Sequence, residues 1–222
     1  MKQNSKNRRM ICISCGKYNF RSLFYKNNYE FKKCKNCGLV YLYPLPSELQ
    51  LAKYYESKAK GGNYDLTKSI ERDRSQKRYL DLILKEKKSG NFLDIGCWDG
   101  KLLEFANESG FDVYGLELQK EAAKKALEKF PNKIHCGVIE KSQDVFPKTK
   151  FSVIVALGVI EHLRSPESLI KFVDNRLEDD GLFVIQTPNE GSLIRKIMGN
   201  YWFCWSAPEH TFYFSLKSLS FL

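Results

Sequence analysis

The stretch Leu93-Asp94-Ile95-Gly96-Cys97-Trp98-Asp99-Gly100 decides the fold of this chain. An apolar run at 92–95 leads into it and an amphipathic run at 101–107 follows it, so the stretch predicts a turn from a buried strand into a helix. In an open α/β sheet, ligands bind where the carboxyl ends of the strands meet such turns. Gly96 and Gly100 let the backbone approach a ligand closely. The sequence therefore predicts a nucleotide-type binding loop here.

Apolar and amphipathic runs alternate on both sides of this loop. Strands are expected at 92–95, 113–116, 134–136, 151–157 and 182–186. Helices are expected at 47–57, 67–88, 101–107, 119–130 and 166–177. Strands and helices that alternate at this spacing indicate an α/β, Rossmann-like fold, with a mostly parallel sheet and helices on both of its faces.

The charges around the loop select its ligand. The pyrophosphate of a dinucleotide needs unpaired N–H groups at a helix start, whereas Asp94 and Asp99 favour a cation here. The spacing of Gly96 and Gly100 also differs from the G-x-G-x-x-G of dinucleotide binders. S-adenosylmethionine carries a sulfonium and an ammonium group, so we expect it in this loop. Glu117 ends the next strand, where a carboxylate can accept hydrogen bonds from the ribose hydroxyls.

Four of the seven cysteines form two pairs near the N-terminus: Cys12, Cys15, Cys34 and Cys37. The two C-x2-C pairs are separated by 18 residues, a spacing typical of structural zinc sites. Gly16 and Gly38 follow the pairs, where the chain must turn sharply. A redox function would need one such pair beside a βαβ unit. We expect four thiolates to hold one Zn²⁺ in a closed site that stabilises the fold and performs no chemistry.

The net charge of +10 lies in the first quarter of the chain. Residues 1–60 contain 13 Lys and Arg against 3 acidic residues, and the remainder contains 23 against 23. A basic segment of this kind either meets phosphate, in nucleic acid or in a nucleotide-linked substrate, or is only a solvated surface. No apolar run approaches about 18 residues and no signal peptide is evident, so a cytoplasmic protein without a membrane partner is expected.

Three later motifs complete a family pattern. They are Val159-Ile160-Glu161-His162-Leu163 at the end of the fourth strand, Thr187-Pro188-Asn189, and Glu209-His210 with Phe214-Ser215. With the 93–97 loop and the cysteine ribbon, they resemble class I S-adenosylmethionine-dependent methyltransferases, and among them the bacterial members with a zinc ribbon that are similar to sugar C-methyltransferases. The resemblance spans nearly the whole chain. One departure is Trp98, which replaces the middle glycine of the D-x-G-C-G-x-G loop and either narrows the loop or points away from it.

The resemblance implies the residues of the site. Those implied for the cofactor are Asp94, Gly96, Cys97, Gly100, Glu117, Leu118, Gly158 and Tyr64. Glu209 and His210 are implied to supply the base that removes a proton from the acceptor carbon, with His162 as a further catalytic or pocket-lining residue.

The acceptor that the resemblance implies is a small molecule, such as a sugar nucleotide or another saccharide precursor. One alternative is an RNA methyltransferase that holds RNA with the basic ribbon, although residues 157–160 lack the Asn/Asp-Pro-Pro-aromatic motif that methylates exocyclic base nitrogens. The other alternative is a non-catalytic binding module with a degenerate methyltransferase domain.

The sequence predicts three segments. They are a zinc ribbon at 1–43, a connector and helical segment covering the cofactor site at 44–90, and a methyltransferase domain at 91–222. The last two strands of a complete sheet have no counterpart, and a helix that Ser215 caps is cut short, so this domain is expected to be C-terminally truncated. The fifth strand would then be an uncovered apolar edge, which predicts self-association. We expect cofactor binding to be better retained than turnover.

Overall fold

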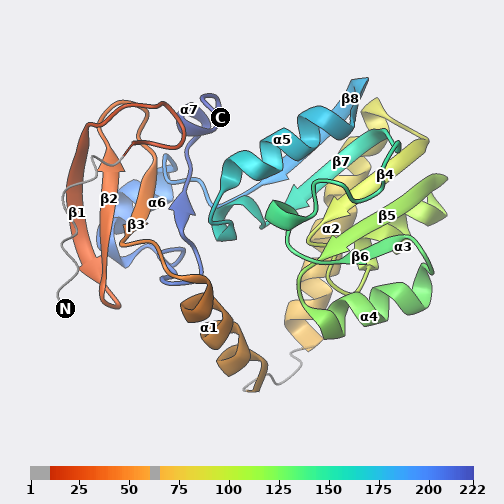
Figure 1. Cartoon of the computed structure of the whole chain (residues 1–222), viewed down its shortest axis with the longest axis horizontal. Helices are drawn as coiled ribbons and strands as arrows, with labels where there is room; N and C mark the ends of the chain where they lie inside the picture. The colour runs from red at the N-terminus through yellow and green to blue at the C-terminus, as the bar shows by residue number, and fades with distance from the viewer. Residues whose placement is uncertain (1–10, 61–65) are drawn as a thin grey trace. The chain divides into compact units, whose positions relative to one another are not determined.

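The computed structural model describes residues 11–60 and 66–222 (Figure 1). Contacts divide the chain into two compact units. Unit 1 comprises the described residues up to Ala59, then Glu161–Pro166 and Thr187–Leu222. Unit 2 comprises the described residues of Lys60–Ile160 and Glu167–Gln186. The structure thus groups residues 187–222 with the ribbon, whereas the sequence predicts them as part of the methyltransferase segment.

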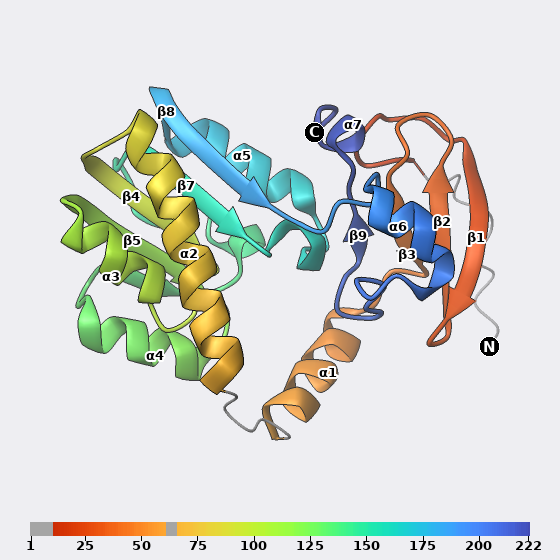
Figure 2. The ribbon, with the colours of Figure 1, turned by 180° about the vertical axis from the view of Figure 1, so that it is seen from behind.

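Unit 2 is built on a parallel five-stranded sheet. In spatial order its strands are β6 (Ile134–Cys136), β5 (Phe111–Glu117), β4 (Gly90–Ile95), β7 (Phe151–Leu157) and β8 (Leu177–Gln186). Its helices are α2 (Leu66–Glu86), α3 (Lys101–Glu108), α4 (Lys120–Lys129) and α5 (Pro166–Arg176). α2 lies over one face of the sheet and α5 over the other (Figures 1 and 2). The predicted α/β, Rossmann-like fold is confirmed.

The core of unit 2 lies between the sheet and its helices. Phe92, Val113 and Val153 from three neighbouring strands are at most 2% exposed, and Leu80 and Ile83 of α2 belong to the same cluster. From β4 the chain first adds β5 and β6 on one side and then returns to add β7 and β8 on the other side. In such sheets ligands bind at the carboxyl ends of the strands next to this switch point, here β4, β5 and β7. The loop after β4 and the last residue of β5 both lie at this edge.

Unit 1 contains an antiparallel four-stranded sheet that joins the two ends of the described chain. Its order is β1 (Phe20–Lys26), β2 (Tyr29–Cys34), β3 (Val40–Tyr43) and β9 (Phe212–Tyr213). Val40 pairs with Tyr213 and Tyr41 with Phe212. The aromatic core beneath it explains why the last segment joins the ribbon, because the Trp205 ring lies 5.3 Å from Phe31 and 4.6 Å from Tyr213.

Short helices complete unit 1: α1 (Glu48–Lys60), α6 (Leu193–Met198) and α7 (Leu216–Leu219). The predicted capping box of α1 is confirmed, since the Ser47 N–H donates to Gln50 Oε1 at 2.8 Å and the Gln50 N–H donates to Ser47 Oγ at 3.2 Å. Ser215 caps α7, as expected. In the part of the chain that the structure describes, no helix is both long and apolar enough to cross a membrane.

Candidate functional site

The two cysteine pairs form equivalent turns. In each turn, the N–H of the first cysteine bonds to the carbonyl five residues later, and the glycine after the second cysteine has a left-handed φ. The hydrogen bonds are Cys12 N–H to Lys17 O at 2.9 Å and Cys34 N–H to Leu39 O at 2.8 Å. The φ angles are 69° at Gly16 and 86° at Gly38. Each turn therefore aims two sulfur atoms in one direction.

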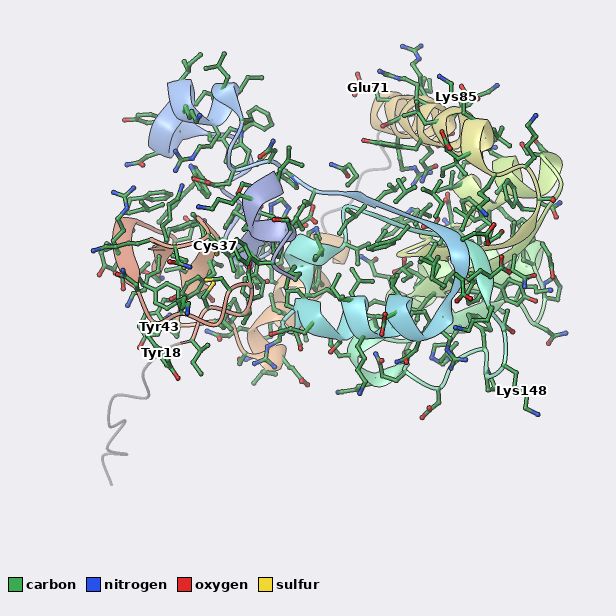
Figure 3. The ribbon with its side chains drawn as sticks, turned by 90° about the horizontal axis from the view of Figure 1, so that it is seen from above. Tyr18, Cys37, Tyr43, Glu71, Lys85 and Lys148 are labelled. Atoms are coloured by element: carbon green, nitrogen blue, oxygen red, sulfur yellow. The ribbon has the colours of Figure 1, made fainter. Side chains whose placement is uncertain are left out.

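The four sulfur atoms fit a single metal ion. They all lie within 4.8 Å of one another, and the Sγ–Sγ separations are 3.6 Å for both Cys12–Cys37 and Cys15–Cys34. A tetrahedral ion with zinc–sulfur distances of about 2.3 Å places its ligands about 3.8 Å apart. Three of the four cysteines are buried, and Cys37 is labelled in Figure 3. This geometry suits a closed structural Zn²⁺ site.

The loop after β4 has a backbone that favours glycine. Gly96 has a φ of +83°, and a Cβ added there would lie 2.7 Å from Cγ2 of Val159. Any side chain at this position would therefore displace either the loop or the Val159 side chain, in addition to the strain of the left-handed φ. Trp98 also has a left-handed φ, 51°, which the glycine of the family pattern would adopt more readily. Its indole is 42% exposed.

Two backbone N–H groups, one from the loop after β4 and one from the residue that follows β5 by two positions, hold the Glu117 side chain in place. Its Oε2 accepts from the Trp98 N–H at 2.9 Å and its Oε1 accepts from the Gln119 N–H at 2.7 Å. The side chain is 5% exposed. Each carboxylate oxygen has a second lone pair, so Glu117 can accept further hydrogen bonds from a ribose without giving these up.

Asp94 at the end of β4 and Asp99 in the following loop have different surroundings. Asp99 lies 3.3 Å from the guanidinium of Arg72 on α2, so its charge is already paired. Among the described residues Asp94 forms no ion pair, so its carboxyl group is the more available of the two to a cationic ligand. Asp94 is 3% exposed, and burial, together with the nearby charge of Glu117, raises the pKa of Asp94 to about 8.

Asp94→Asn is expected to raise the melting temperature of the ligand-free protein at alkaline pH. Because the unfolded state releases the Asp94 proton near pH 3.9 and the folded state near pH 8, wild-type stability falls by up to about 1.4 kcal/mol per pH unit between them. Asparagine cannot ionise, so the advantage of the variant should grow over this range and then level off. Thermal unfolding at pH 5, 7 and 9 measures it; an advantage that shrinks with rising pH would contradict the assignment.

The other predicted cofactor residues differ in accessibility. Cys97 is 1% exposed and its side chain belongs to the core, so it can meet a ligand only through its backbone. Leu118 is 51% exposed. Gly100 and Gly158 both have left-handed φ angles, of 81° and 67°. Tyr64 lies outside the described residues. The cofactor roles of all of these stay predictions.

A second group of polar side chains lies in unit 1, where Glu161–Pro166 packs against the segment before β9. Thr211 connects the two segments through its N–H, which donates to Glu161 O at 2.7 Å. The rings of His162 and His210 pack edge to face, with centroids 4.7 Å apart. Glu209 precedes His210 in the chain, so the structure brings the three predicted catalytic residues together.

Backbone carbonyls orient both imidazoles. Nδ1 of His210 donates to Cys204 O at 3.1 Å, and Nδ1 of His162 donates to Glu209 O at 3.1 Å. Since a carbonyl can only accept, Nδ1 carries the proton in each neutral ring, and Nε2 is the basic nitrogen. A histidine with this tautomer can remove a proton through Nε2.

Two glutamates accompany these histidines. Glu209 Oε2 accepts from the Tyr54 hydroxyl at 2.9 Å. Glu161 is 3% exposed, and burial, with a smaller effect of the Glu209 charge, raises the pKa of Glu161 to about 7. Ligand atoms of Glu161, His162 and His210 lie within 4.8 Å of one another. The cluster can therefore transfer a proton or hold a divalent cation.

Sequence reasoning missed several residues of these sites. Arg72, which pairs with Asp99, sits in an ordinary amphipathic helical pattern. Tyr54 and Tyr55 lie on α1, where the Tyr55 hydroxyl is 3.3 Å from Nδ1 of His162. Nothing in their local sequence distinguishes them from surface-helix residues, because their partners come from distant parts of the chain.

Comparison with known proteins gives a consistent assignment. The family described as "Methyltransferase domain" matches residues 69–222. The ubiquinone biosynthesis O-methyltransferase of Glaesserella parasuis is 30% identical over 119 residues, which cover 48% of this chain and 50% of that protein. An uncharacterized methyltransferase of Alkaliphilus oremlandii is 27% identical over 139 residues, covering 61% and 63%. The chain spans about half the length of the curated relatives it matches.

Solved structures agree on the fold. The crystal structure of a SAM dependent methyltransferase from Archaeoglobus fulgidus aligns with a TM-score of 0.55 at 23% identity, covering 76% of this chain and 71% of that one. At this identity the likeness concerns the fold alone.

Proposed function

Because the chain belongs to the class I S-adenosylmethionine-dependent methyltransferase superfamily, we propose that it transfers a methyl group from S-adenosylmethionine to a small-molecule acceptor. The observation that carries this proposal is the buried carboxylate of Glu117, fixed by two N–H groups at the end of β5 beside the Gly96 loop. When bound, the cofactor supplies an electrophilic methyl group on a sulfonium.

The residues of unit 2 bind and orient that cofactor in this proposal. Glu117 accepts hydrogen bonds from the ribose hydroxyls, and Gly96 lets the backbone approach the methionine end. Asp94, near the end of β4 and next to this loop, supplies a carboxyl group. A cationic ligand favours ionisation of that group, because an opposite charge stabilises a carboxylate. Asp99 has its partner in Arg72 and stabilises the loop.

Glu117→Ala is expected to weaken S-adenosylmethionine binding by roughly 10- to 100-fold, because hydrogen bonds to a charged group contribute about 1.5–3 kcal/mol. Isothermal titration of the zinc-loaded protein measures the affinity. The matched control is Glu128→Ala, an exposed glutamate of α4 that should leave the affinity unchanged. Absence of binding to folded wild type would refute the proposed function and favour a non-catalytic module; equal affinity of the Glu117 variant would refute the ribose role.

Within this proposal the acceptor is a sugar nucleotide or another saccharide precursor, which the sequence resemblance supports. Glu209 and His210 supply the base, and His162 orients this pair through the Glu209 carbonyl. Zn²⁺ in the four-cysteine cluster has a structural role. The ribbon at 1–43, the connector at 44–90 and the domain from 91 stay predictions, as does self-association through β8, which among the described strands pairs only with β7.

An RNA acceptor is the second candidate, and the basic charge of residues 1–60 favours it. Bulk RNA binding that is tight and falls steeply with salt would support RNA, because neutralised phosphates release counterions. Weak binding would support a small acceptor.

A further inference from the structure

We propose that unit 1 holds a binding site for a diphosphate group, in a pocket of about 530 Å³ between the second cysteine turn and the last segment of the chain. The pocket belongs entirely to unit 1. Its lining residues are Arg21, Lys33, Cys34, Lys35, Asn36, Cys37, Gly38, Glu190, Gly191, Lys196, Ser215 and Lys217.

The lining is strongly cationic. It contains five Lys and Arg side chains and a single carboxylate, that of Glu190. Glu190 is 3% exposed and lies 2.8 Å from both Lys33 and Arg195, so its charge is already compensated. Among the described residues, Arg21, Lys35 and Lys196 form no ion pair. These cations come from separate elements of the fold, and they converge on one cavity.

Hydrogen bonds build the wall of the pocket. Lys217 Nζ donates to Asn36 O at 2.9 Å, which ties α7 to the second cysteine turn. Lys33 is held by both oxygens of Glu190, at 2.8 and 2.9 Å. The site is therefore assembled from positioned side chains, and an anion bound there would displace water from cations whose geometry is already partly fixed.

The metal site accounts for only part of this charge. Four thiolates around one Zn²⁺ carry a net charge of −2, and cations near Cys34 and Cys37 offset it. The five cations around the pocket exceed this requirement once Glu190 has been compensated. The excess is free to act on a ligand that carries two or more negative charges.

The chemistry of the lining favours a small phosphorylated ligand over a polynucleotide. Proteins hold single-stranded nucleic acid by stacking its bases on aromatic side chains, and none of the lining residues is aromatic. The volume is in the range of small-molecule sites. A diphosphate group offers negative charge and acceptor oxygens to several Lys and Arg donors at once.

This inference rests on the proposed function only where it assigns the diphosphate group to the methyl acceptor, as in a sugar nucleotide. Binding of the diphosphate itself needs no S-adenosylmethionine. The two ideas are therefore tested separately, and failure of one is distinguishable from failure of the other.

The test titrates inorganic pyrophosphate into the zinc-loaded full chain by calorimetry, in phosphate-free buffer without S-adenosylmethionine. We expect one site, with affinity lowered at least about 10-fold in the double variant Arg21→Ser/Lys196→Ser, since two charge-assisted contacts are lost. The control Lys53→Ser/Lys125→Ser removes two exposed cations outside the pocket and should change the affinity less than about twofold. Zinc content and melting temperature of each variant establish that it is folded.

Three results would overturn the proposal. The first is no saturable binding of pyrophosphate to folded wild type. The second is equal weakening in the pocket variant and in the control, which would indicate a general charge effect. The third is an oligouridine RNA that binds more tightly than pyrophosphate and depends on Arg21 and Lys196, which would make this surface a nucleic-acid site.

Discussion

Removal of the metal from the four-cysteine cluster is expected to unfold the ribbon sheet of unit 1 and to leave unit 2 able to bind S-adenosylmethionine. The binding free energy of structural Zn²⁺ in small domains is about 10–16 kcal/mol, and it is largely folding free energy. β1 and β2 lie between the two cysteine turns in the chain, and β3 follows the second turn and completes the small sheet of the ribbon. Without the metal, buried Cys12, Cys34 and Cys37 would have to be accommodated as separate thiols.

The tryptophans report this unfolding selectively. The chain has three, and two of them, Trp202 and Trp205, are 3% and 2% exposed in the core of unit 1. The third, Trp98, is already 42% exposed in unit 2. Chelation should therefore shift the tryptophan emission to the red with release of about one zinc per chain, while calorimetry still detects S-adenosylmethionine.

Cys34→Ser should reproduce the effect of the chelator, and Cys136→Ser is the matched control because Cys136 is exposed and lies in unit 2. Zinc release with unchanged tryptophan emission would contradict a structural role. Loss of cofactor binding together with the emission shift would show that the two units do not fold independently.

Periodicity made the sheet of unit 2 predictable. β7 and most of β4 are buried on both faces, so they read as short apolar runs, and α3, which follows β4, is amphipathic. The ribbon strands carry a weaker signal. β1 contains an irregularity between Ser22 and Phe24 that breaks the alternation of side chains. β9 has two residues and pairs with a strand more than 160 positions earlier, and no local pattern encodes such a pairing.

The residues of the candidate sites could be predicted from the sequence, but the hydrogen-bond and ion-pair partners of those residues could not. The sequence indicates Glu117 because an acidic residue ends the strand after the glycine loop. It does not show that the backbone of Trp98 and Gln119 holds that carboxylate. It likewise indicates Asp99 as a second carboxylate near the loop, and it does not show that Arg72 pairs with that carboxylate in the structure. The competing partner comes from an earlier helix, and only the folded chain brings the two together.

His210→Asn is expected to lower methyl transfer by roughly 10²- to 10⁴-fold, the contribution of a positioned general base, with S-adenosylmethionine affinity changed less than about twofold. The Cys204 carbonyl fixes the Nδ1–H tautomer of His210, which makes Nε2 the proton acceptor. Asparagine keeps a donor for that carbonyl and has no basic nitrogen. The variant therefore separates proton removal from positioning of the ring.

The measurement is formation of S-adenosylhomocysteine with a panel of nucleotide-linked sugars, recorded against pH for wild type, His210→Asn and Glu209→Gln. Glu209→Gln keeps an oxygen for the Tyr54 hydroxyl and should lose less activity than His210→Asn. A wild-type rate that rises with pH, and loses this dependence in His210→Asn, would support the base. Activity that instead requires an added divalent cation, and disappears equally in His162, His210 and Glu161 variants, would replace the base with a metal held by that cluster.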